Sequence, residues 1–266
     1  MTEKILHKIP TECPWRDTLY WYDCLDSTNN QAKLLSRRGA AHGTILIAGQ
    51  QTAGRGRMGR VFQSPPNAGV YLSLILRPAC PPSELMHLTC AAGVAMSEAI
   101  ERAAGFRPGI KWINDLVYDK KKLGGILTEL SLDSKTGLVE YAVIGIGINC
   151  TQQPHQFPQE IQDIATSLSM VAGRVIPPDV LAAEMVTALW ELDSHIFTEK
   201  ATIMDAYRKQ CVTLGQPVVV IRPDGSYPGQ ALTMDDDGGL LVAFSNGHTE
   251  VVNSGEVSVR GFYDYV

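Results

Sequence analysis

The hydrophobic and polar positions follow two different periods along most of the chain. Short apolar runs bounded by glycine, proline or asparagine are typical of strands. They span residues 44–51, 70–76, 110–112, 115–118, 122–132 and 138–148. Longer segments with apolar residues three and four positions apart are typical of helices. They span residues 27–39, 83–104 and most of 177–208. This alternation predicts an α/β (α+β) fold in which helices pack on a mixed β-sheet.

The pattern changes at about residue 214. Short apolar runs follow, separated by Asp-Gly, Asp-Asp-Gly-Gly and Asn-Gly sequences that favour tight turns. The runs span residues 217–221, 229–233, 239–244 and 249–252. We therefore expect two domains, a larger one of residues 1–213 and a small β-barrel of residues 214–266.

The composition fits a globular protein and excludes several other classes. Of the 266 residues, 45% are hydrophobic and 19% are charged, enough to bury a substantial core. The net charge of −5 argues against a nucleic-acid binder, whose domains are usually basic. The six cysteines include no close pair and the six histidines no metal-binding spacing, so we expect reduced thiols and no zinc site. Without a signal peptide or a membrane-spanning apolar run, the expected location is the cytoplasm, with no membrane partner.

The segment Gln51–Arg60 is the first candidate for chemistry. It contains three glycines and three arginines directly after a predicted strand. Glycine lets the main chain approach a ligand closely and adopt positive φ, and arginine supplies planar charged donors for phosphate or carboxylate. The segment therefore predicts a backbone cradle for an anion.

Two known glycine-loop motifs fit the letters of this segment but not its surroundings. Gly54, Gly56 and Gly59 have the spacing of the dinucleotide-binding fingerprint, yet Pro65 and Pro66 prevent a helix from starting there, and no acidic residue follows at the required distance. A protein-kinase glycine loop requires His-Arg-Asp and Asp-Phe-Gly sequences downstream, and the chain has neither. A flexible basic surface loop or a nucleic-acid tail stays open as the interpretation of this segment alone.

Further segments extend the pattern. They are Asp26–Asn29, Lys111–Tyr118, Lys122–Leu130 and Ile144–Asn149. Together with the glycine-arginine segment, in this order and spacing, they resemble the biotin protein ligases from about residue 20 to the C-terminus. The resemblance implies that ATP and biotin form biotinyl-5′-AMP with release of pyrophosphate. Biotin then passes to a specific lysine of a biotin carboxyl carrier domain, part of a biotin-dependent carboxylase. The terminal barrel is expected to be SH3-like, with residues 254–258 as its closing motif.

The resemblance leaves alternatives open. Some members of the family carry an additional N-terminal DNA-binding domain, but few residues precede the resemblance here, so we expect the form without it and no nucleic-acid partner. A related ligase or transferase for lipoate or octanoate is the alternative enzyme. A binding module without enzymatic activity is the alternative class. The sequence leaves a homodimer open.

The resemblance also implies roles for individual residues. Its biotin and adenylate contacts fall on Ser27, Thr28, Asn29, Gln51, Gly54, Arg55, Gly56, Arg57 and Lys122. Its catalytic residues fall on Arg57, Asp115 and Lys122, with Mg²⁺ expected near Asp115. Its nucleotide contacts fall on Phe62, Asn114 and Asn149. Positive charges suit the reaction, because two anions, the biotin carboxylate and the ATP α-phosphate, must be brought together.

Several of these residues also have a plainer interpretation. Ser27 and Thr28 fit a helix N-cap, and Asn114 fits a turn. Asn149 fits the end of a strand, and we expect Trp112 to be a core residue rather than a ligand contact.

Lys122 belongs to a run of three lysines, which is typical of a solvated surface. In a regular strand, however, it shares a face with Gly124 and Ile126, and the bare glycine leaves room for a ligand. The family places its catalytic lysine here, so we assign that role to Lys122 and not to its two neighbours.

Three positions depart from the family pattern. Phe62 stands where tryptophan is common, Ile113 where proline is usual, and Gly49 where an acidic residue often precedes the glutamine. Phe62 retains an aromatic face for stacking on a nucleotide base. Ile113 removes a backbone restraint beside Asn114.

Overall fold

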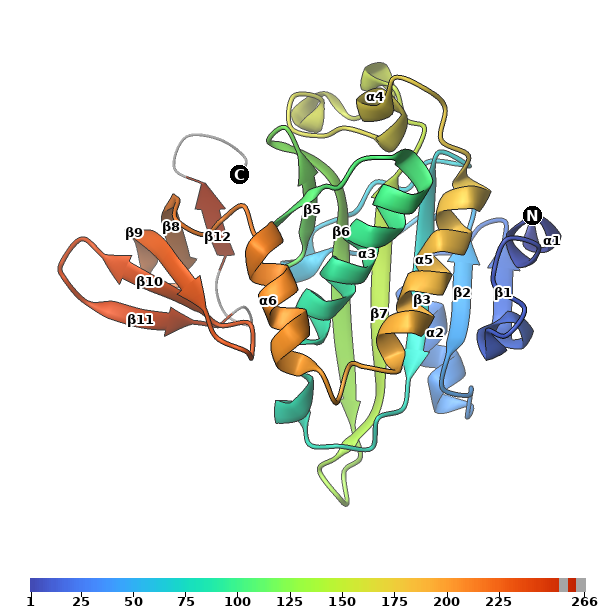
Figure 1. Ribbon diagram of the computed structural model, residues 1–266, viewed down its shortest axis with the longest axis horizontal. Helices are drawn as coiled ribbons and strands as arrows, with labels where there is room; N and C mark the ends of the chain where they lie inside the picture. The colour runs from blue at the N-terminus through green and yellow to red at the C-terminus, as the bar shows by residue number, and fades with distance from the viewer. Residues whose placement is uncertain (254–257, 262–266) are drawn as a thin grey trace.

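The computed structural model describes residues 1–253 and 258–261 and contains two β-sheets (Figure 1). The larger sheet has seven strands in the order β1-β2-β3-β7-β6-β5-β4. In chain order they are β1 (Leu19–Tyr22), β2 (Thr44–Ala48), β3 (Gly69–Leu76), β4 (Gly109–Lys111), β5 (Asp115–Tyr118), β6 (Lys121–Leu132) and β7 (Val139–Asn149). Strands β1 and β2 run parallel and the other neighbouring pairs are antiparallel, so the sheet is mixed, as predicted.

Helices cover both faces of this sheet (Figure 1). On one face lie α3 (Leu88–Ala104), α5 (Pro178–Asp193) and α6 (Lys200–Gln210), and on the other lies α2 (Thr28–Arg37). Two short helices are α1 (Thr2–Leu6) and α4 (Leu168–Ala172). Each face of the sheet has its own apolar cluster, the larger one beneath α3 and α5 and the smaller one beneath α2. Within the described residues, no helix is long and apolar enough to span a membrane.

Strand β7 shows why the α2 face has space for a ligand. Along Ile144–Ile148 isoleucine alternates with glycine, and the isoleucines are at most 3% exposed within the larger core. Because successive residues of a strand point to opposite faces, Gly145 and Gly147 leave the α2 face without side chains. Asn29 of α2 occupies the space over Gly145, where a Cβ would lie 2.0 Å from its Oδ1.

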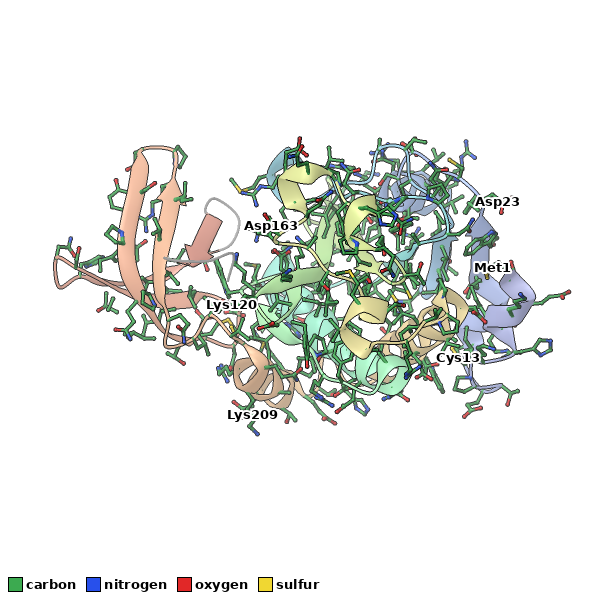
Figure 2. All side chains as sticks on the ribbon, turned by 90° about the horizontal axis from the view of Figure 1, so that it is seen from above. Met1, Cys13, Asp23, Lys120, Asp163 and Lys209 are labelled. Carbon is green, nitrogen blue, oxygen red and sulfur yellow. The ribbon has the colours of Figure 1, made fainter. Side chains whose placement is uncertain are left out.

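The second sheet is antiparallel, with its five strands in the order β11-β10-β9-β8-β12. They are β8 (Pro217–Arg222), β9 (Gly225–Met234), β10 (Leu240–Phe244), β11 (Thr249–Val252) and β12 (Ser258–Gly261). The small C-terminal β-fold predicted from the turn spacing is therefore confirmed, whereas residues 254–257 of the predicted closing motif lie outside the described residues. Figure 2 shows this sheet standing apart from the larger body, with Met1 and Cys13 at the opposite end of the molecule.

The turn between β4 and β5 links the larger sheet to the C-terminal part of the chain. The Trp112 side chain is 4% exposed, and its Nε1–H donates to the carbonyl of Gly238 at 2.9 Å. The backbone N–H of Trp112 donates to Thr213 Oγ1 at 2.9 Å, and the hydroxyl of Tyr207 in α6 donates to the carbonyl of Ile113 at 3.1 Å. The turn is therefore held from three directions. Trp112 is buried, as expected of a core residue, and it also lines the cavity described below.

The sequence pattern missed some boundaries. A 3₁₀ turn at Pro82–Leu85 precedes α3, which begins five residues later than predicted, at Leu88. The long helix predicted over 177–208 is two helices, because the chain leaves helical geometry over 194–199 while the apolar spacing continues through it. No element was predicted before residue 27, where α1 and β1 form, since β1 is a four-residue edge strand with no marked alternation.

Two glycines, Gly93 inside α3 and Gly105 directly after it, provide a test of where this helix ends. Gly105 ends the helix with a φ of +84°, which glycine adopts with the least strain. We expect Gly105→Ala to lower the free energy of unfolding by about 1 kcal/mol. Gly93→Ala should instead raise it by up to about 1 kcal/mol, because alanine favours the helix interior. A Cβ at Gly93 meets its nearest neighbour at an ordinary 3.4 Å. Urea unfolding measures both signs, and equal destabilisation by the two variants would contradict this helix end.

Candidate active site

A cavity of about 560 Å³ lies between the start of α2, the glycine-arginine segment and strands β5, β6 and β7. It brings together nearly all of the residues implied by the resemblance. Those that line it are Ser27, Thr28, Asn29, Gln51, Arg55, Gly56, Arg57, Phe62, Asn114, Asp115, Lys122 and Asn149. Gly54 is buried behind the wall instead.

The glycine-arginine segment folds into a narrow hairpin over the cavity. The N–H of Gly56 donates to the carbonyl of Arg60 at 2.7 Å, and the N–H of Phe62 donates to the carbonyl of Gly54 at 2.9 Å. A Cβ on Gly54 would lie 2.3 Å from the carbonyl oxygen of Phe62. Glycine is required at this position because the two arms of the hairpin approach so closely.

The expected positive φ angles occur at only part of the segment. Met58 and Gly59 at the tip have φ of 55° and 73°. Gly56 has an extended φ of −120°, and Gly54 is not among the residues with positive φ. The expectation is therefore wrong for these two glycines, whose backbone is extended or paired within the hairpin arms.

One end of the cavity is neutral and polar. Gln51 Oε1 accepts hydrogen bonds from the backbone N–H of Thr28 at 2.8 Å and from Thr28 Oγ1 at 3.1 Å. Gln51 Nε2 donates to Ser64 Oγ at 2.9 Å. Ser27 is 1% exposed and occupies the N-cap position of α2, but its side chain makes no capping hydrogen bond. The interpretation of Ser27 and Thr28 as side-chain caps of α2 is therefore wrong: Ser27 makes no capping hydrogen bond, and the Thr28 hydroxyl donates to Gln51.

Asn29 and Arg55 meet at a carboxylate that the sequence reasoning missed. Asn29 Nδ2 donates to Glu129 Oε2 at 2.9 Å, and Arg55 Nη1 donates to Glu129 Oε1 at 3.1 Å. Lys33 Nζ also lies 2.9 Å from Glu129 Oε1. Burial raises the pKa of Glu129, but the hydrogen bonds from Lys33 and Asn29 and the nearby charges outweigh it, so the pKa lies below its ordinary value. Glu129 lies within the segment Lys122–Leu130 that carries part of the resemblance, but its contact with α2 exists only in the folded chain.

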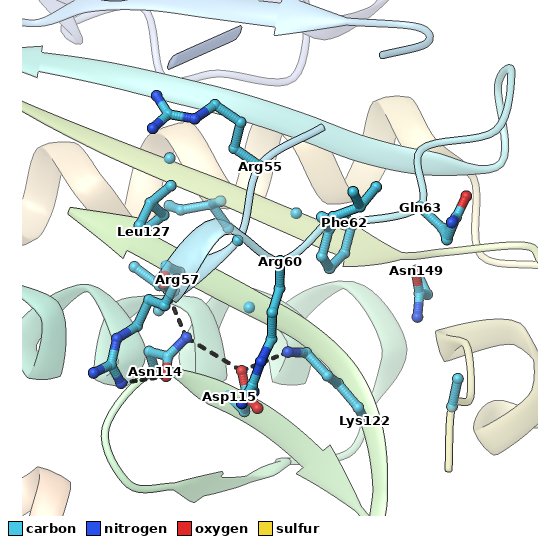
Figure 3. Close-up of a pocket in the computed structure, with 18 of the residues that line it drawn as sticks. Arg55, Arg57, Arg60, Phe62, Gln63, Asn114, Asp115, Lys122, Leu127 and Asn149 are labelled. Carbon is cyan, nitrogen blue, oxygen red and sulfur yellow. Dashed lines mark hydrogen bonds and ion pairs between the residues drawn. The ribbon is translucent and has the colours of Figure 1, made fainter. Parts of the chain in front are cut away.

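The other end of the cavity is charged (Figure 3). Lys122 Nζ lies 2.6 Å from Asp115 Oδ1, which also accepts from Asn114 Nδ2 at 3.2 Å. Arg57 Nη1 donates to Asn114 Oδ1 at 3.2 Å, so the four side chains form a continuous chain of contacts. Figure 3 shows the Arg60 side chain, which also lines the cavity, reaching toward the same carboxylate.

The position of Lys122 corrects one step of the sequence reasoning. Strand β6 has an irregularity opposite β5, where Leu116 pairs with Gly124 and Val117 with Lys122. The extra residue resets the alternation of side chains. Lys122 therefore lies beside Gly125, where a Cβ would be 3.3 Å from Lys122 Nζ, and not beside Gly124 and Ile126 as predicted. The glycine that leaves space for a ligand beside Lys122 is therefore Gly125.

The Arg57 guanidinium is more deeply buried than a surface arginine. Burial lowers its pKa from the ordinary value, and the charge of Asp115 partly offsets that effect. An arginine nevertheless remains charged at neutral pH. Arg57 therefore brings a partly desolvated positive charge to the cavity, where an anion interacts with it more strongly than in water.

Phe62 and Asn149 line the cavity beyond the charged chain. A Cβ on Gly147 would lie 2.5 Å from the Phe62 ring, so the ring rests on the bare strand β7. Asn149 Nδ2 donates to the carbonyl of Thr166 at 3.0 Å, and Gln152 Nε2 donates to Asn149 Oδ1 at 3.2 Å. Asn149 thus ends β7 and also secures the loop that follows.

That loop supplies an apolar wall that sequence reasoning missed. The lining residues are Phe157, Ile161, Ile164 and Ala165. The loop is attached beside Lys122, whose backbone N–H donates to the carbonyl of Ile164 at 2.8 Å. No periodic pattern marks this segment, because its short 3₁₀ turns bury side chains irregularly.

Residues 21–149 match the model of the biotin/lipoate A/B protein ligase family, and residues 213–260 match that of the biotin protein ligase C terminal domain. The bifunctional ligase/repressor BirA of Bacillus subtilis is 38% identical over 89% of this chain and 72% of its own length. The biotin–[acetyl-CoA-carboxylase] ligase of Paracoccus denitrificans is 31% identical over 89% of this chain and 98% of its own.

A solved biotin protein ligase from Aquifex aeolicus, in complex with biotin and ATP, has a similar structure. Its TM-score is 0.77 at 30% identity, over 92% of this chain and 99% of that chain. The chain belongs to the biotin protein ligase family. The predicted fold, function and enzyme class, biotin–[acetyl-CoA-carboxylase] ligase, are thereby confirmed.

The lowered pKa of Glu129 gives a prediction about acid stability. A carboxylate whose pKa is depressed in the folded state stabilises the fold above its unfolded pKa, and this contribution is lost as pH falls through the folded pKa. We expect the free energy of unfolding to fall less steeply in Glu129→Gln than in the natural chain from about pH 7 to about pH 3. Urea unfolding at a series of pH values measures this slope. Glu160→Gln, on the surface, should keep the natural slope, and an unchanged slope in Glu129→Gln would refute the role of Glu129.

Proposed function

We propose that this cavity joins biotin to AMP and that Arg57 and Lys122 stabilise the reacting anions. The observation that carries the proposal is the chain of contacts from Arg57 through Asn114 and Asp115 to Lys122 along one wall. An oxygen of the biotin carboxylate attacks the α-phosphorus of ATP. The bond from that phosphorus to the bridging oxygen breaks, and pyrophosphate leaves.

Both reactants are negatively charged, so the step requires fixed positive charge at the reacting atoms. The Lys122 ammonium and the Arg57 guanidinium are on the same wall and are partly buried. Each charge-assisted hydrogen bond from them contributes on the order of 1.5–3 kcal/mol. Asp115 holds Lys122 in place before the substrates bind, and the phosphate oxygens then compete for the same ammonium.

The neutral end of the cavity receives the ureido ring of biotin. Thr28 and Gln51 form one polar group there, and Ser27 adds a buried hydroxyl. A buried polar site discriminates strongly against a ligand that leaves its groups unpaired. This supports biotin over octanoate, whose alkyl chain offers nothing to these groups.

The nucleotide lies toward Phe62, Asn149 and the apolar wall of residues 157–165. The Phe62 ring offers a face for an adenine base, in place of the more common tryptophan. The apolar wall keeps water away from the mixed anhydride, which otherwise hydrolyses. Arg55, held by Glu129, contributes from the rim of the cavity.

Magnesium is expected to accompany ATP. Within the described residues, no three His, Cys, Asp or Glu side chains form a metal cluster. Among the described residues that line the cavity, Asp115 carries the one carboxylate. One carboxylate fits an ion whose other ligands are phosphate oxygens and water, and such an ion neutralises phosphate charge. Asp115 is therefore the protein group that would hold Mg²⁺.

In the second step the carrier lysine attacks the acyl carbon of biotinyl-5′-AMP, an amide forms, and AMP leaves. Asp115 is positioned to orient that lysine or to accept its proton. The acceptor we propose is a biotin carboxyl carrier domain. The division into residues 1–213 and 214–266, the cytoplasmic location and the form without a DNA-binding domain stay predictions.

Exchange of labelled pyrophosphate into ATP tests this function without knowledge of the carrier. We expect exchange that depends on Mg²⁺ and biotin, and none with lipoate or octanoate. Exchange with lipoate or octanoate in place of biotin would assign the cavity to the related ligases. A lack of exchange with any of the three acids would contradict an adenylating site.

Lys122→Ala should lower the rate of biotinyl-5′-AMP formation by about 10²–10³-fold, the usual effect of removing a transition-state contact. Lys121→Ala is the matched control, because that neighbouring lysine is exposed and does not line the cavity. Single-turnover assays with radiolabelled ATP measure both rates. Equal rates in the two variants would remove Lys122 from the mechanism.

Asp115→Asn should impair transfer to the carrier more than adenylate formation. The amide keeps the size of the side chain but neither accepts a proton nor carries a charge. We expect about 10²–10⁴-fold slower transfer from preformed biotinyl-5′-AMP, as for loss of a general base. Adenylation should be less affected, through the lost ion pair with Lys122. The assignment is wrong if both half-reactions slow by the same factor.

A further inference from the structure

Ser64 does not line the cavity but lies directly behind its neutral end. Its side chain is 5% exposed, and its hydroxyl lies 2.9 Å from Gln51 Nε2. Its backbone carbonyl accepts from the N–H of Gln51 at 3.2 Å. Ser64 therefore contacts both the main chain and the side chain of Gln51.

The hydrogen bonds that join Thr28, Gln51 and Ser64 can run in only one direction. The backbone N–H of Thr28 can only donate, so the Gln51 atom that faces it at 2.8 Å is the oxygen Oε1. Gln51 Nε2 then donates to Ser64 Oγ. The hydroxyl proton of Ser64 is directed to the carbonyl of Phe62 at 3.1 Å, so Ser64 Oγ is an acceptor toward Gln51.

The direction of these hydrogen bonds determines whether the Thr28 hydroxyl acts as a donor or an acceptor toward a ligand. Thr28 Oγ1 donates its proton to Gln51 Oε1 at 3.1 Å, so only the lone pairs of the oxygen remain for the cavity. A ligand group that contacts this oxygen must therefore be a donor. A ureido N–H is such a donor, whereas the alkyl chain of octanoate and the dithiolane ring of lipoate have none.

Gly54 closes over the same contact. A Cβ on Gly54 would lie 2.7 Å from Ser64 Oγ and 3.1 Å from Gln51 Nε2. The hairpin therefore covers the hydrogen bond only because this residue has no side chain. Covered from water, the bond has no solvent molecule to replace it, so loss of its acceptor leaves Gln51 Nε2 without a partner and the carboxamide held from the Thr28 side alone.

We propose that Ser64 is a positioning residue that fixes the Gln51 carboxamide and thereby makes Thr28 an acceptor for a ureido N–H of biotin. The inference rests on the proposed placement of biotin at this end of the cavity. It gives Ser64 a part in selecting the acid, although Ser64 does not touch the substrate.

Ser64→Ala tests the inference. We expect the Kd of biotin, measured by calorimetry, to rise about tenfold, as for loss of one hydrogen bond, while the Kd of ATP stays within about twofold. Ser36→Ala is the matched control, because that serine is also buried, at 2% exposed, and donates to the carbonyl of Ala32 away from the cavity. The control should leave both dissociation constants unchanged. An unchanged Kd of biotin in Ser64→Ala, or an equal rise for ATP, would overturn the proposal.

A pair of biotin analogues, each methylated on one ureido nitrogen, separates positioning from a general structural effect. With the natural chain, the analogue that lacks the N–H facing Thr28 should bind more weakly than its isomer. Ser64→Ala should reduce this difference about tenfold, since the carboxamide that takes the Thr28 hydroxyl proton is then anchored on one side only. The same difference in both proteins would overturn the proposal. If the natural chain binds no biotin at all, it is the proposed function that fails.

Discussion

The ion pair between Lys122 and Asp115 is the contact on which the geometry of the site depends. It joins β6 to β5 with 2.6 Å between the charged atoms, and the side chains are only 28% and 15% exposed. Removal of one partner from such a partly buried pair leaves a charge without compensation, which costs more than the loss of a surface pair. The same carboxylate orients Asn114, and Asn114 in turn holds Arg57. The Asp115 carboxylate therefore links both cations of the site, directly to Lys122 and through Asn114 to Arg57.

The cavity separates two kinds of recognition along its length. Thr28, Gln51 and the buried hydroxyl of Ser27 form a neutral end, whereas Arg57 and Lys122 form a charged end. Such a separation suits a substrate with an uncharged ring and a reactive carboxylate. Bare glycines on β6 and β7 keep the floor between the two ends open. The apolar loop after β7 covers the charged end, so the interactions there act in a medium of lower dielectric than water.

Most of the fold could be predicted because its signals are local, whereas the roles of the site residues follow from the resemblance of the whole ordered set of segments to one family. The isoleucine-glycine alternation of β7 and the arginines of the hairpin can be identified in short stretches of sequence. Features that depend on how strands pair, or on contacts between distant parts of the chain, could not be predicted. The irregularity in β6 moves Lys122 from the side of Gly124 to that of Gly125, and the alternation of a regular strand does not show it. Glu129 meets α2 across a hundred residues of sequence, and a pattern confined to one strand contains no such information.

In the proposed mechanism one cavity holds both substrates, with the reacting groups at Lys122 and Arg57. The most direct test is a crystal structure with a hydrolysis-resistant analogue of biotinyl-5′-AMP. The proposed mechanism requires the group that replaces the acyl phosphate to lie within about 3 Å of Lys122 Nζ, with the ureido ring at Thr28. An analogue bound in the reverse orientation, or a Lys122 that remains paired with Asp115 and out of reach of the ligand, would contradict it.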